Sequence, residues 1–286
     1  MSTPPHLRLP GCAKAYHLAT ARGPFAVHDA MPPDGGSDGT VLLVPGFTGS
    51  KEDFIPVLEP LALAGYRVVA LDQRGQFETP GPDDLAAYDL AELGADLIAI
   101  GAAVGDEPVH LVGHSFGGLS VRAAVIGFPA AVRSATLLCS GPSAIDDPEA
   151  TRCQMLLGLL AELDLPDIWA FVSSMAEAND EYTGVGTDVV EFMGRRFMQS
   201  TKAGLIAMGT QICEEPDRTD ELAATGVPLM VAYGEGDYIW QPAEQAAMAE
   251  RLAARHEVIR DAAHSPAVQN PRAFTDLMID FLRSVR

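Results

Sequence analysis

The sequence predicts an α/β fold in which helices flank a mostly parallel sheet and one helical segment is inserted between two strands. Short runs rich in β-branched residues alternate with stretches of helical periodicity, a pattern typical of parallel sheets covered by helices. The alternation breaks once, between Ser140 and about Pro228, over a length far greater than a simple crossover between parallel strands needs. With 286 residues, 48% of them hydrophobic, the chain can bury the core of such a fold.

Eight apolar runs are predicted to be strands. "KAYHLAT" (14–20) and "FAVHDA" (25–30) suggest an antiparallel opening pair. The other six runs are the expected buried strands of the main sheet, and they span 40–46, 66–72, 108–114, 134–140, 228–234 and 256–262. Helical periodicity between the strands predicts helices over 52–64, 86–104, 116–127, 242–254 and 271–285.

The long gap between two of these strands predicts a helical cap over residues 143–215. It contains "CQMLLGLLAELDLPDIWAFVSSMAEA" and "VVEFMGRRFMQSTKAGLIAMGTQI", which both carry apolar residues at three- and four-residue spacing. The core of the fold is then expected to comprise residues 1–142 and 216–286. "PPDGGSDG" (32–39) is dense in Gly, Pro and Asp and predicts a turn.

Charge and hydropathy limit the classes of partner. The formal net charge of −20, from 39 acidic and 19 basic residues, opposes binding to nucleic acid or to an anionic membrane surface. No apolar stretch of signal-peptide length follows a basic start, and no window approaches the ~18 apolar residues of a membrane-spanning helix. We therefore expect a cytoplasmic protein whose partner is a small-molecule substrate rather than a nucleic acid or a membrane.

Neither a metal nor an organic cofactor is indicated. The cysteines lie far apart and lack CxxC spacing; they are Cys12, Cys139, Cys153 and Cys213. His110 and His114 are four residues apart, but that spacing serves metal binding on helices, and these two residues lie on a predicted strand and its turn. The sequence has no HExxH, GxGxxG or Walker motif, so we expect no metal, nucleotide or other cofactor.

The stretch "LVGHSFGGLS" (111–120) carries the strongest chemical signal in the chain. Ser115 lies between Gly113 and Gly117, after a predicted strand and before a predicted helix. A sharp strand-to-helix turn needs residues without bulk two positions before and after its centre, and glycine meets this need. The pattern predicts that Ser115 is a nucleophile exposed at such a turn.

A serine nucleophile needs a base, and the base needs an acid that orients it. Asp237 follows the strand in "VAYGEGDYIWQP", and His264 follows the last strand in "EVIRDAAHSP". Loops at the carboxyl ends of parallel strands meet at one edge of the sheet, so we expect Ser115, Asp237 and His264 to lie together. Other carboxylates compete for the role of the acid, namely Glu235, Asp146 and Asp147.

These motifs, in this order, resemble the α/β-hydrolase superfamily, and the resemblance extends over essentially the whole chain. It implies an α/β-hydrolase fold with a helical cap and a serine triad. "LLVPGFTGSKEDF" resembles the family's oxyanion-hole loop, which implies that the backbone N–H groups of Phe47 and Phe116 form the oxyanion hole. "LDQRGQFETP" resembles the family's Asp-x-Arg-Gly loop.

Two stretches depart from the family pattern. Pro45–Gly46 stands where the family commonly has His-Gly, which removes a side chain that braces the oxyanion loop. Gln76, Phe77 and Glu78 follow Arg74–Gly75 where the family usually has small residues, which predicts a bulkier and more polar pocket floor.

The sequence therefore predicts a carboxylesterase-like serine hydrolase that cleaves a carboxylic ester, thioester or lactone of a largely apolar small molecule through an acyl-enzyme. Carbon–carbon bond hydrolysis, cofactor-free perhydrolysis and lyase chemistry use the same triad in relatives, and a slow ligand receptor is a further alternative. Trp169 and Trp240 are candidates for the pocket wall. The net charge disfavours anionic substrates, although an arginine of the cap could reverse this locally; the candidates are Arg152, Arg195 and Arg196.

Overall fold

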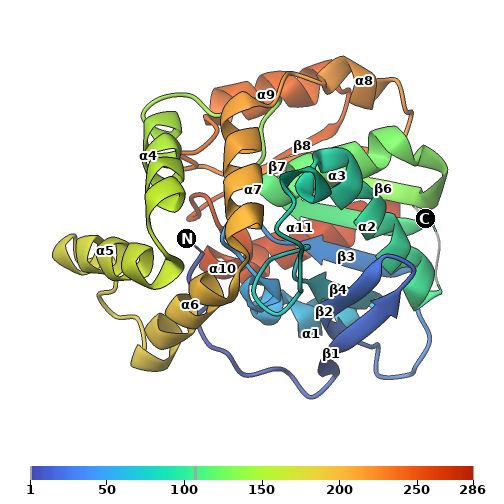
Figure 1. The fold of residues 1–286 in the computed structure, drawn as a ribbon. Helices are drawn as coiled ribbons and strands as arrows, with labels where there is room; N and C mark the ends of the chain where they lie inside the picture. Colours follow the sequence, from blue (N-terminus) through green and yellow to red (C-terminus); the bar gives the residue numbers. More distant parts are fainter. Residues whose placement is uncertain (1, 106–107, 286) are drawn as a thin grey trace.

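A computed structural model describes residues 2–105 and 108–285 and contains one eight-stranded sheet (Figure 1). Its strands are β1 (Ala13–Thr20), β2 (Gly23–Ala30), β3 (Thr40–Val44), β4 (Arg67–Leu71), β5 (Val109–His114), β6 (Val132–Leu138), β7 (Leu229–Gly234) and β8 (Arg255–Ile259). They lie in the order β1-β2-β4-β3-β5-β6-β7-β8. β1 pairs with β2 and β2 with β4 in antiparallel fashion, and the other neighbours are parallel, so the predicted α/β fold with an antiparallel opening pair is confirmed.

Helices cover the sheet on both faces, which is why the central strands β3, β5 and β7 are buried at every residue. α1 (Ile55–Leu63) packs with α11 (Pro271–Ser284), and α2 (Leu90–Val104) packs with α3 (Phe116–Gly127). α3 also contacts α8 (Thr219–Ala223), which in turn contacts α9 (Pro242–Arg251).

Two of the predicted helices begin later than expected, because a 3-10 turn occupies their start. The turn η1 (Lys51–Phe54) precedes α1, and the turn η2 (Leu85–Tyr88) precedes α2. Pro56 lies in the first turn of α1, where its fixed backbone angle and missing N–H are tolerated, so the α-helix proper starts there. Two short helices were not predicted: α8 and α10 (Pro266–Gln269).

Four of the helices between β6 and β7 lie in the region where the sequence predicts a cap. They are α4 (Glu149–Glu162), α5 (Leu165–Ala178), α6 (Thr187–Gln199) and α7 (Lys202–Glu214), grouped beside one end of the sheet in Figure 1. Each of the two predicted helical stretches is thus divided in two. Pro166 is tolerated only in a first helical turn, and Thr201 caps α7 by accepting a hydrogen bond from Gly204 N at 3.2 Å.

A buried ion pair joins these helices to the core. Arg196 on α6 is fully buried and donates from Nη1 to Oδ1 of Asp53 in η1 at 2.8 Å. Within residues 2–105 and 108–285, no helix combines the length and the hydropathy needed to cross a membrane.

Candidate active site

Ser115 lies at a tight turn between β5 and α3. Its backbone has φ +54° and ψ −124°, a conformation that non-glycine residues rarely adopt. A Cβ on Gly113 would lie 2.3 Å from Gly117 O, so a side chain there would clash within the turn. A Cβ on Gly117 would lie 2.5 Å from Pro45 O, so a side chain there would clash with the chain at the end of β3. The two glycines of the motif therefore allow the strained position that Ser115 occupies.

The loops after three strands bring Ser115, His264 and Asp237 together. His264 Nε2 lies 2.9 Å from Ser115 Oγ, and His264 Nδ1 lies 2.8 Å from Asp237 Oδ1. Ser115 follows β5, Asp237 follows β7 and His264 follows β8, each at the carboxyl end of its strand. Ser115 and His264 are 149 residues apart in the sequence. This continuous chain of hydrogen bonds can pass a proton from the serine hydroxyl to the imidazole.

The Asp237 carboxylate is buried and well supplied with hydrogen-bond donors. Oδ1 also accepts from Ile239 N at 3.1 Å, and Oδ2 accepts from Gln245 Nε2 at 2.8 Å. Burial would raise the pKa of Asp237, but the hydrogen bonds from His264, Ile239 and Gln245 outweigh it and lower that pKa. The carboxylate is therefore held ionised beside His264.

Gln245 was not found by sequence reasoning. It is fully buried on α9, and its Nε2 also donates to Trp240 O at 2.8 Å. A glutamine on the apolar side of an otherwise amphipathic helix is the one sequence signal that could have drawn attention to it.

The competing carboxylates lie elsewhere. Glu235 Oε1 accepts a hydrogen bond from Asp261 N at 2.8 Å. Asp147 is exposed and its Oδ1 accepts from Thr151 at the start of α4, and Asp146 is also exposed. Of the carboxylates considered from the sequence, Asp237 alone contacts His264 within the described residues.

His114 supports the backbone of His264. Its Nε2 lies 2.5 Å from His264 O, and burial lowers the pKa of His114 to about 3, so its ring is neutral and donates its N–H to that carbonyl. His110 contacts a different partner, with Nδ1 2.8 Å from Ser134 Oγ. The two histidines therefore have separate hydrogen-bond partners.

One group of side chains in the described residues has the composition of a metal site. Potential ligand atoms of Cys139, Asp237 and His264 lie within 4.8 Å of one another. Asp237 and His264 already use these atoms in their mutual hydrogen bond, and burial together with the charge of Asp237 raises the pKa of the Cys139 thiol well above its usual range. A protonated thiol is a poor metal ligand, so this geometry suits a hydrogen-bonded cluster better than a cation site.

The two residues expected to supply oxyanion donors flank Ser115. Phe116 is the first residue of α3, where an N–H has no partner within its helix, and Phe47 follows the loop at Gly46. A Cβ on Gly46 would lie 2.9 Å from Ser115 Cβ, so this loop passes directly against the serine. Within the described residues, neither N–H has a backbone acceptor, which leaves both able to bind an oxyanion.

The loop at Pro45–Gly46 is braced from the Asp-x-Arg-Gly loop. Gln73 Nε2 donates to Pro45 O at 2.9 Å, and Gln76 Nε2 donates to Gly46 O at 2.9 Å. These two amides hold the loop although no histidine stands at position 45.

The expected effect of Gln76, Phe77 and Glu78 on the pocket floor is therefore corrected. None of the three is among the described residues that line the pocket. Gln76 braces the neighbouring loop, Phe77 packs edge-on against Phe192 of α6 at 5.5 Å, and Glu78 pairs with Lys51 at 2.7 Å. Their bulk and polarity serve contacts with the neighbouring loop, with η1 and with α6.

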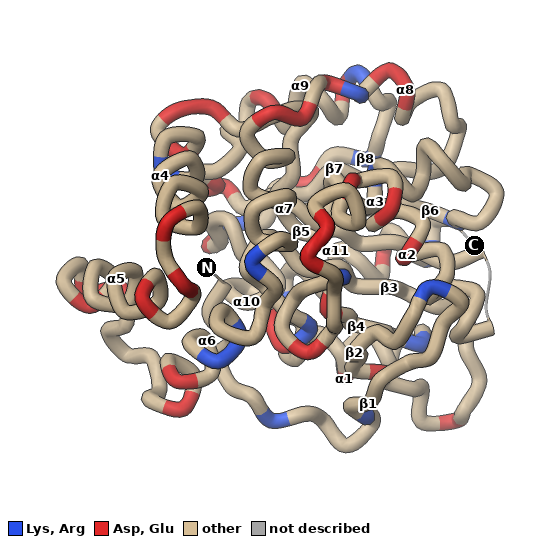
Figure 2. The backbone as a smooth tube through the Cα atoms, viewed as in Figure 1, with Lys and Arg blue, Asp and Glu red and all other residues tan. Residues whose placement is uncertain are grey.

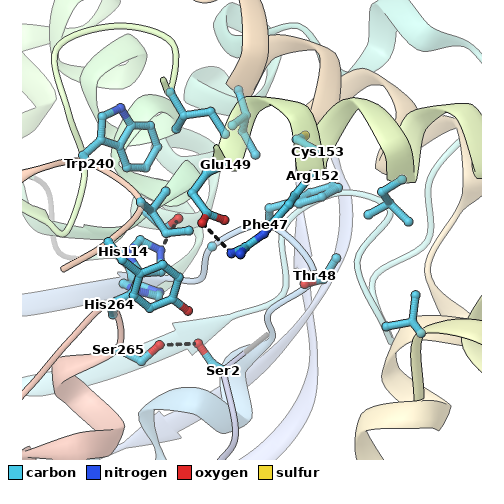
Figure 3. Close-up of a pocket in the computed structure, with 18 of the residues that line it drawn as sticks. Ser2, Phe47, Thr48, His114, Glu149, Arg152, Cys153, Trp240, His264 and Ser265 are labelled. Atoms are coloured by element: carbon cyan, nitrogen blue, oxygen red, sulfur yellow. Dashed lines mark hydrogen bonds and ion pairs between the residues drawn. The ribbon is translucent and has the colours of Figure 1, made fainter. Parts of the chain in front are cut away.

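Ser115 lines a cavity of about 270 Å³, which Figure 3 shows in close-up. The core lines it near Ser115 and His264, and all four inserted helices contribute, through Arg152, Leu156, Val172, Phe197 and Ile212 among others. Trp240 lines the pocket, as expected, and its ring lies 6.5 Å from the His264 ring.

Trp169 is not among the described lining residues, contrary to the expectation. It packs between α5 and α6, with its ring 6.0 Å from Phe197, and Phe197 faces the cavity in its place. Helical periodicity identified α5 as amphipathic, but only the packing of α5 on α6 decides which apolar side chain reaches the cavity.

Sequence comparison finds one matching family and several relatives. The profile of the "Alpha/beta hydrolase family" matches residues 41–277. RutD of Variovorax paradoxus (strain S110), whose name gives it as a provisional carbamate hydrolase, is 29% identical over an alignment of 265 residues that covers 88% of this chain and 94% of that protein. The non-heme haloperoxidase of Rhodococcus erythropolis is 25% identical over 261 residues, with the same coverage of 88% and 94%.

Solved structures share the fold over nearly the whole chain. A thermophilic esterase from Thermogutta terrifontis, solved with malate bound, has a TM-score of 0.75 at 24% identity, covering 96% of this chain and 99% of the esterase. The enol-lactonase from Burkholderia xenovorans LB400 has a TM-score of 0.74 at 19% identity, covering 94% and 100%. Because these proteins are named for different substrates, the shared fold alone does not select one.

Proposed function

Because the chain belongs to the alpha/beta hydrolase family, we propose that it is a serine hydrolase cleaving a carboxylic ester, thioester or lactone through an acyl-enzyme. The observation that carries this proposal is the chain of hydrogen bonds from Ser115 Oγ through His264 to Asp237, at 2.9 and 2.8 Å. The strained backbone of Ser115 supports it further, since such strain at a polar residue facing a cavity is typical of functional sites.

In the proposed mechanism, His264 Nε2 takes the hydroxyl proton as Ser115 Oγ attacks the carbonyl carbon of the substrate. Asp237 accepts the Nδ1 proton of His264 in a hydrogen bond, which sets the tautomer and stabilises the imidazolium that forms. The N–H groups of Phe47 and Phe116 bind the oxyanion of the tetrahedral intermediate. His264 then protonates the leaving group, and water repeats the sequence on the acyl-enzyme.

The inserted helices support an apolar substrate and a role as a cap. Apolar side chains from all four helices face the cavity, namely Leu156, Val172, Phe197 and Ile212. We propose that residues 143–215 cover the site and that residues 1–142 and 216–286 form the catalytic core. Each buried methylene of the substrate would contribute about 0.8 kcal/mol of binding free energy.

Labelling and turnover test the proposal. A fluorophosphonate probe should label Ser115, and Ser115→Ala should abolish turnover of a short p-nitrophenyl ester, because losing a triad nucleophile costs several orders of magnitude in rate. Ser174→Ala is the matched control, because Ser174 is exposed on α5 and its hydroxyl donates to Phe171 O within the same helix. Retention of more than a few per cent of the activity by Ser115→Ala would refute the covalent mechanism.

The same assay separates an enzyme from a slow ligand receptor that keeps the triad. Many fast cycles are expected of the enzyme. A single slow acylation followed by no further turnover would favour the receptor.

A further inference from the structure

One cationic side chain lies in the proposed active-site pocket. Arg152 comes from the first turn of α4 and lines the cavity together with Ser115, and no other Lys or Arg is among the described lining residues. Figure 3 shows its side chain extending from α4 into the pocket, where the guanidinium meets the Glu149 carboxylate. We propose that Arg152 binds a carboxylate of the substrate, so that the preferred substrates are esters that also bear a free acid group.

The guanidinium is accessible to a ligand. Its side chain is 68% exposed, and its Nη1 donates to Glu149 Oε1 at 2.6 Å. A guanidinium presents five N–H donors in a planar fork, so one bond to Glu149 leaves most of its donors for a second carboxylate. The exposed position means that Arg152 is not already committed to the fold.

Hydroxyl groups give the same pocket further polar atoms. Ser2 Oγ lies 3.0 Å from Ser265 Oγ, and Thr48 also lines the cavity. Ser2 and Ser265 lie below the Arg152 guanidinium in Figure 3. A carboxylate between Arg152 and these hydroxyls would have charged and neutral donors on two sides.

The other two cap arginines do not offer this site. Arg196 is fully buried and donates to Asp53 Oδ1 and to Ser2 O, both at 2.8 Å. Arg195 is exposed on α6 and is not among the described lining residues. The net charge of −20 disfavours anionic substrates, and acidic residues predominate on this face of the protein (Figure 2). Of the three cap arginines, Arg152 is therefore the one that can attract an anion to the pocket.

Glu149 determines how strongly an anionic substrate is favoured. Its carboxylate is 11% exposed and competes with the substrate for the same guanidinium. Removing its charge should strengthen binding of an anion, and removing the charge of Arg152 should weaken it. The substitutions at Glu149 and Arg152 should therefore change anion binding in opposite directions.

The inference rests on the proposed hydrolase function, and matched ester pairs test it. The first pair is mono-p-nitrophenyl glutarate and its methyl-capped neutral diester. The second pair is 6-acetoxyhexanoate and its methyl ester, which moves the acid to the alcohol side. The quantity measured is the ratio of kcat/KM for the acid to kcat/KM for its neutral partner.

In at least one pair, this ratio should fall about tenfold in Arg152→Gln, because a charge-assisted hydrogen-bonded pair is lost. It should rise in Glu149→Gln and stay at the wild-type value in Arg195→Gln, which removes the same charge from the cap away from the pocket. A ratio that is unchanged in Arg152→Gln for both pairs, or that falls equally in Arg195→Gln, would overturn the inference. Turnover of the neutral esters that depends on Ser115 would still support the hydrolase proposal.

A binding measurement covers the case in which no ester is turned over. Glutarate should bind the Ser115→Ala protein in titration calorimetry, and adding Arg152→Gln should weaken that binding about tenfold. Equal binding by the two proteins, or no binding by either, would overturn the carboxylate site independently of the hydrolase proposal.

Discussion

Gln245 donates from Nε2 to Asp237 Oδ2 at 2.8 Å, while Oδ1 of the same carboxylate faces His264. Gln245 and His264 thus each form a hydrogen bond to a different oxygen of the Asp237 carboxylate. Gln245 Nε2 also donates a hydrogen bond to the backbone oxygen of Trp240, and this tryptophan lines the pocket. Gln245 is therefore a positioning residue that acts on the chemistry through Asp237.

Replacing Gln245 by Met should change the pH profile as well as the rate. Without this donor, the negative charge of Asp237 is less stabilised and attracts protonated His264 more strongly. The acid limb of kcat/KM should move to higher pH, and further still in Gln245→Glu, where a second carboxylate is added. Profiles that superimpose on the wild type, measured with the same ester, would assign Gln245 a purely structural role.

Gln76 is expected to hold the oxyanion loop in place. In Gln76→Leu the carbonyl of Gly46 loses the hydrogen bond from Gln76 and keeps the one from Gly49 N at 3.0 Å, so the N–H of Phe47 is held less firmly relative to the reacting carbonyl. Because that N–H would act mainly in the transition state, kcat and kcat/KM should fall together by about tenfold or more, with little change in KM. A rise in KM at unchanged kcat would contradict this assignment, and a thermal melt checks that the variant is folded.

His114 should make the protein less stable in acid. Burial lowers the pKa of His114 from 6.5 to about 3 in the folded state, so between these values the unfolded chain binds the extra proton. This contribution to stability is complete above about pH 6.5 and is lost as the pH falls toward 3, with a slope of up to about 1.4 kcal/mol per pH unit.

His114→Asn removes that titration while keeping a side-chain donor near His264 O. The free energy of unfolding, measured in denaturant from pH 7 to pH 4, should fall less steeply in the variant than in the wild type. Parallel pH dependences would show that His114 does not titrate between the two states.

Phe197 and Leu156 should set the length of apolar chain that the pocket accepts. Among neutral esters, kcat/KM should rise with acyl length until the cavity of about 270 Å³ is filled. Phe197→Ala and Leu156→Ala enlarge the cavity, so the optimum should move to longer chains. Met155→Ala serves as the control, because Met155 is exposed on α4 and does not line the pocket. An optimum at the same length in all four proteins would exclude the inserted helices as the element that sets specificity.

Local sequence was sufficient for the order of strands and helices and for the grouping of Ser115, Asp237 and His264. Strand and helix periodicities are short-range patterns, and the carboxyl ends of neighbouring parallel strands must lie at one edge of the sheet. Residues in the loops after β5, β7 and β8 therefore meet for topological reasons, which can be read from the chain without knowing how any side chain packs.

Tertiary packing decided the contacts of side chains that do not lie at the carboxyl ends of neighbouring parallel strands. Whether Phe197 or Trp169 reaches the cavity depends on how α5 rests on α6, and periodicity gives only a helix face. Gln245 meets Asp237 only because α9 packs against the end of β7, and Gln76 reaches Gly46 O only because two loops touch. Arg152, Arg195 and Arg196 are equivalent in composition, yet one lines the pocket, one is exposed on α6 and one is buried against Asp53. The reason is that a side chain's partners follow from distances between elements, which are set by close packing of the whole core and not by neighbours in sequence.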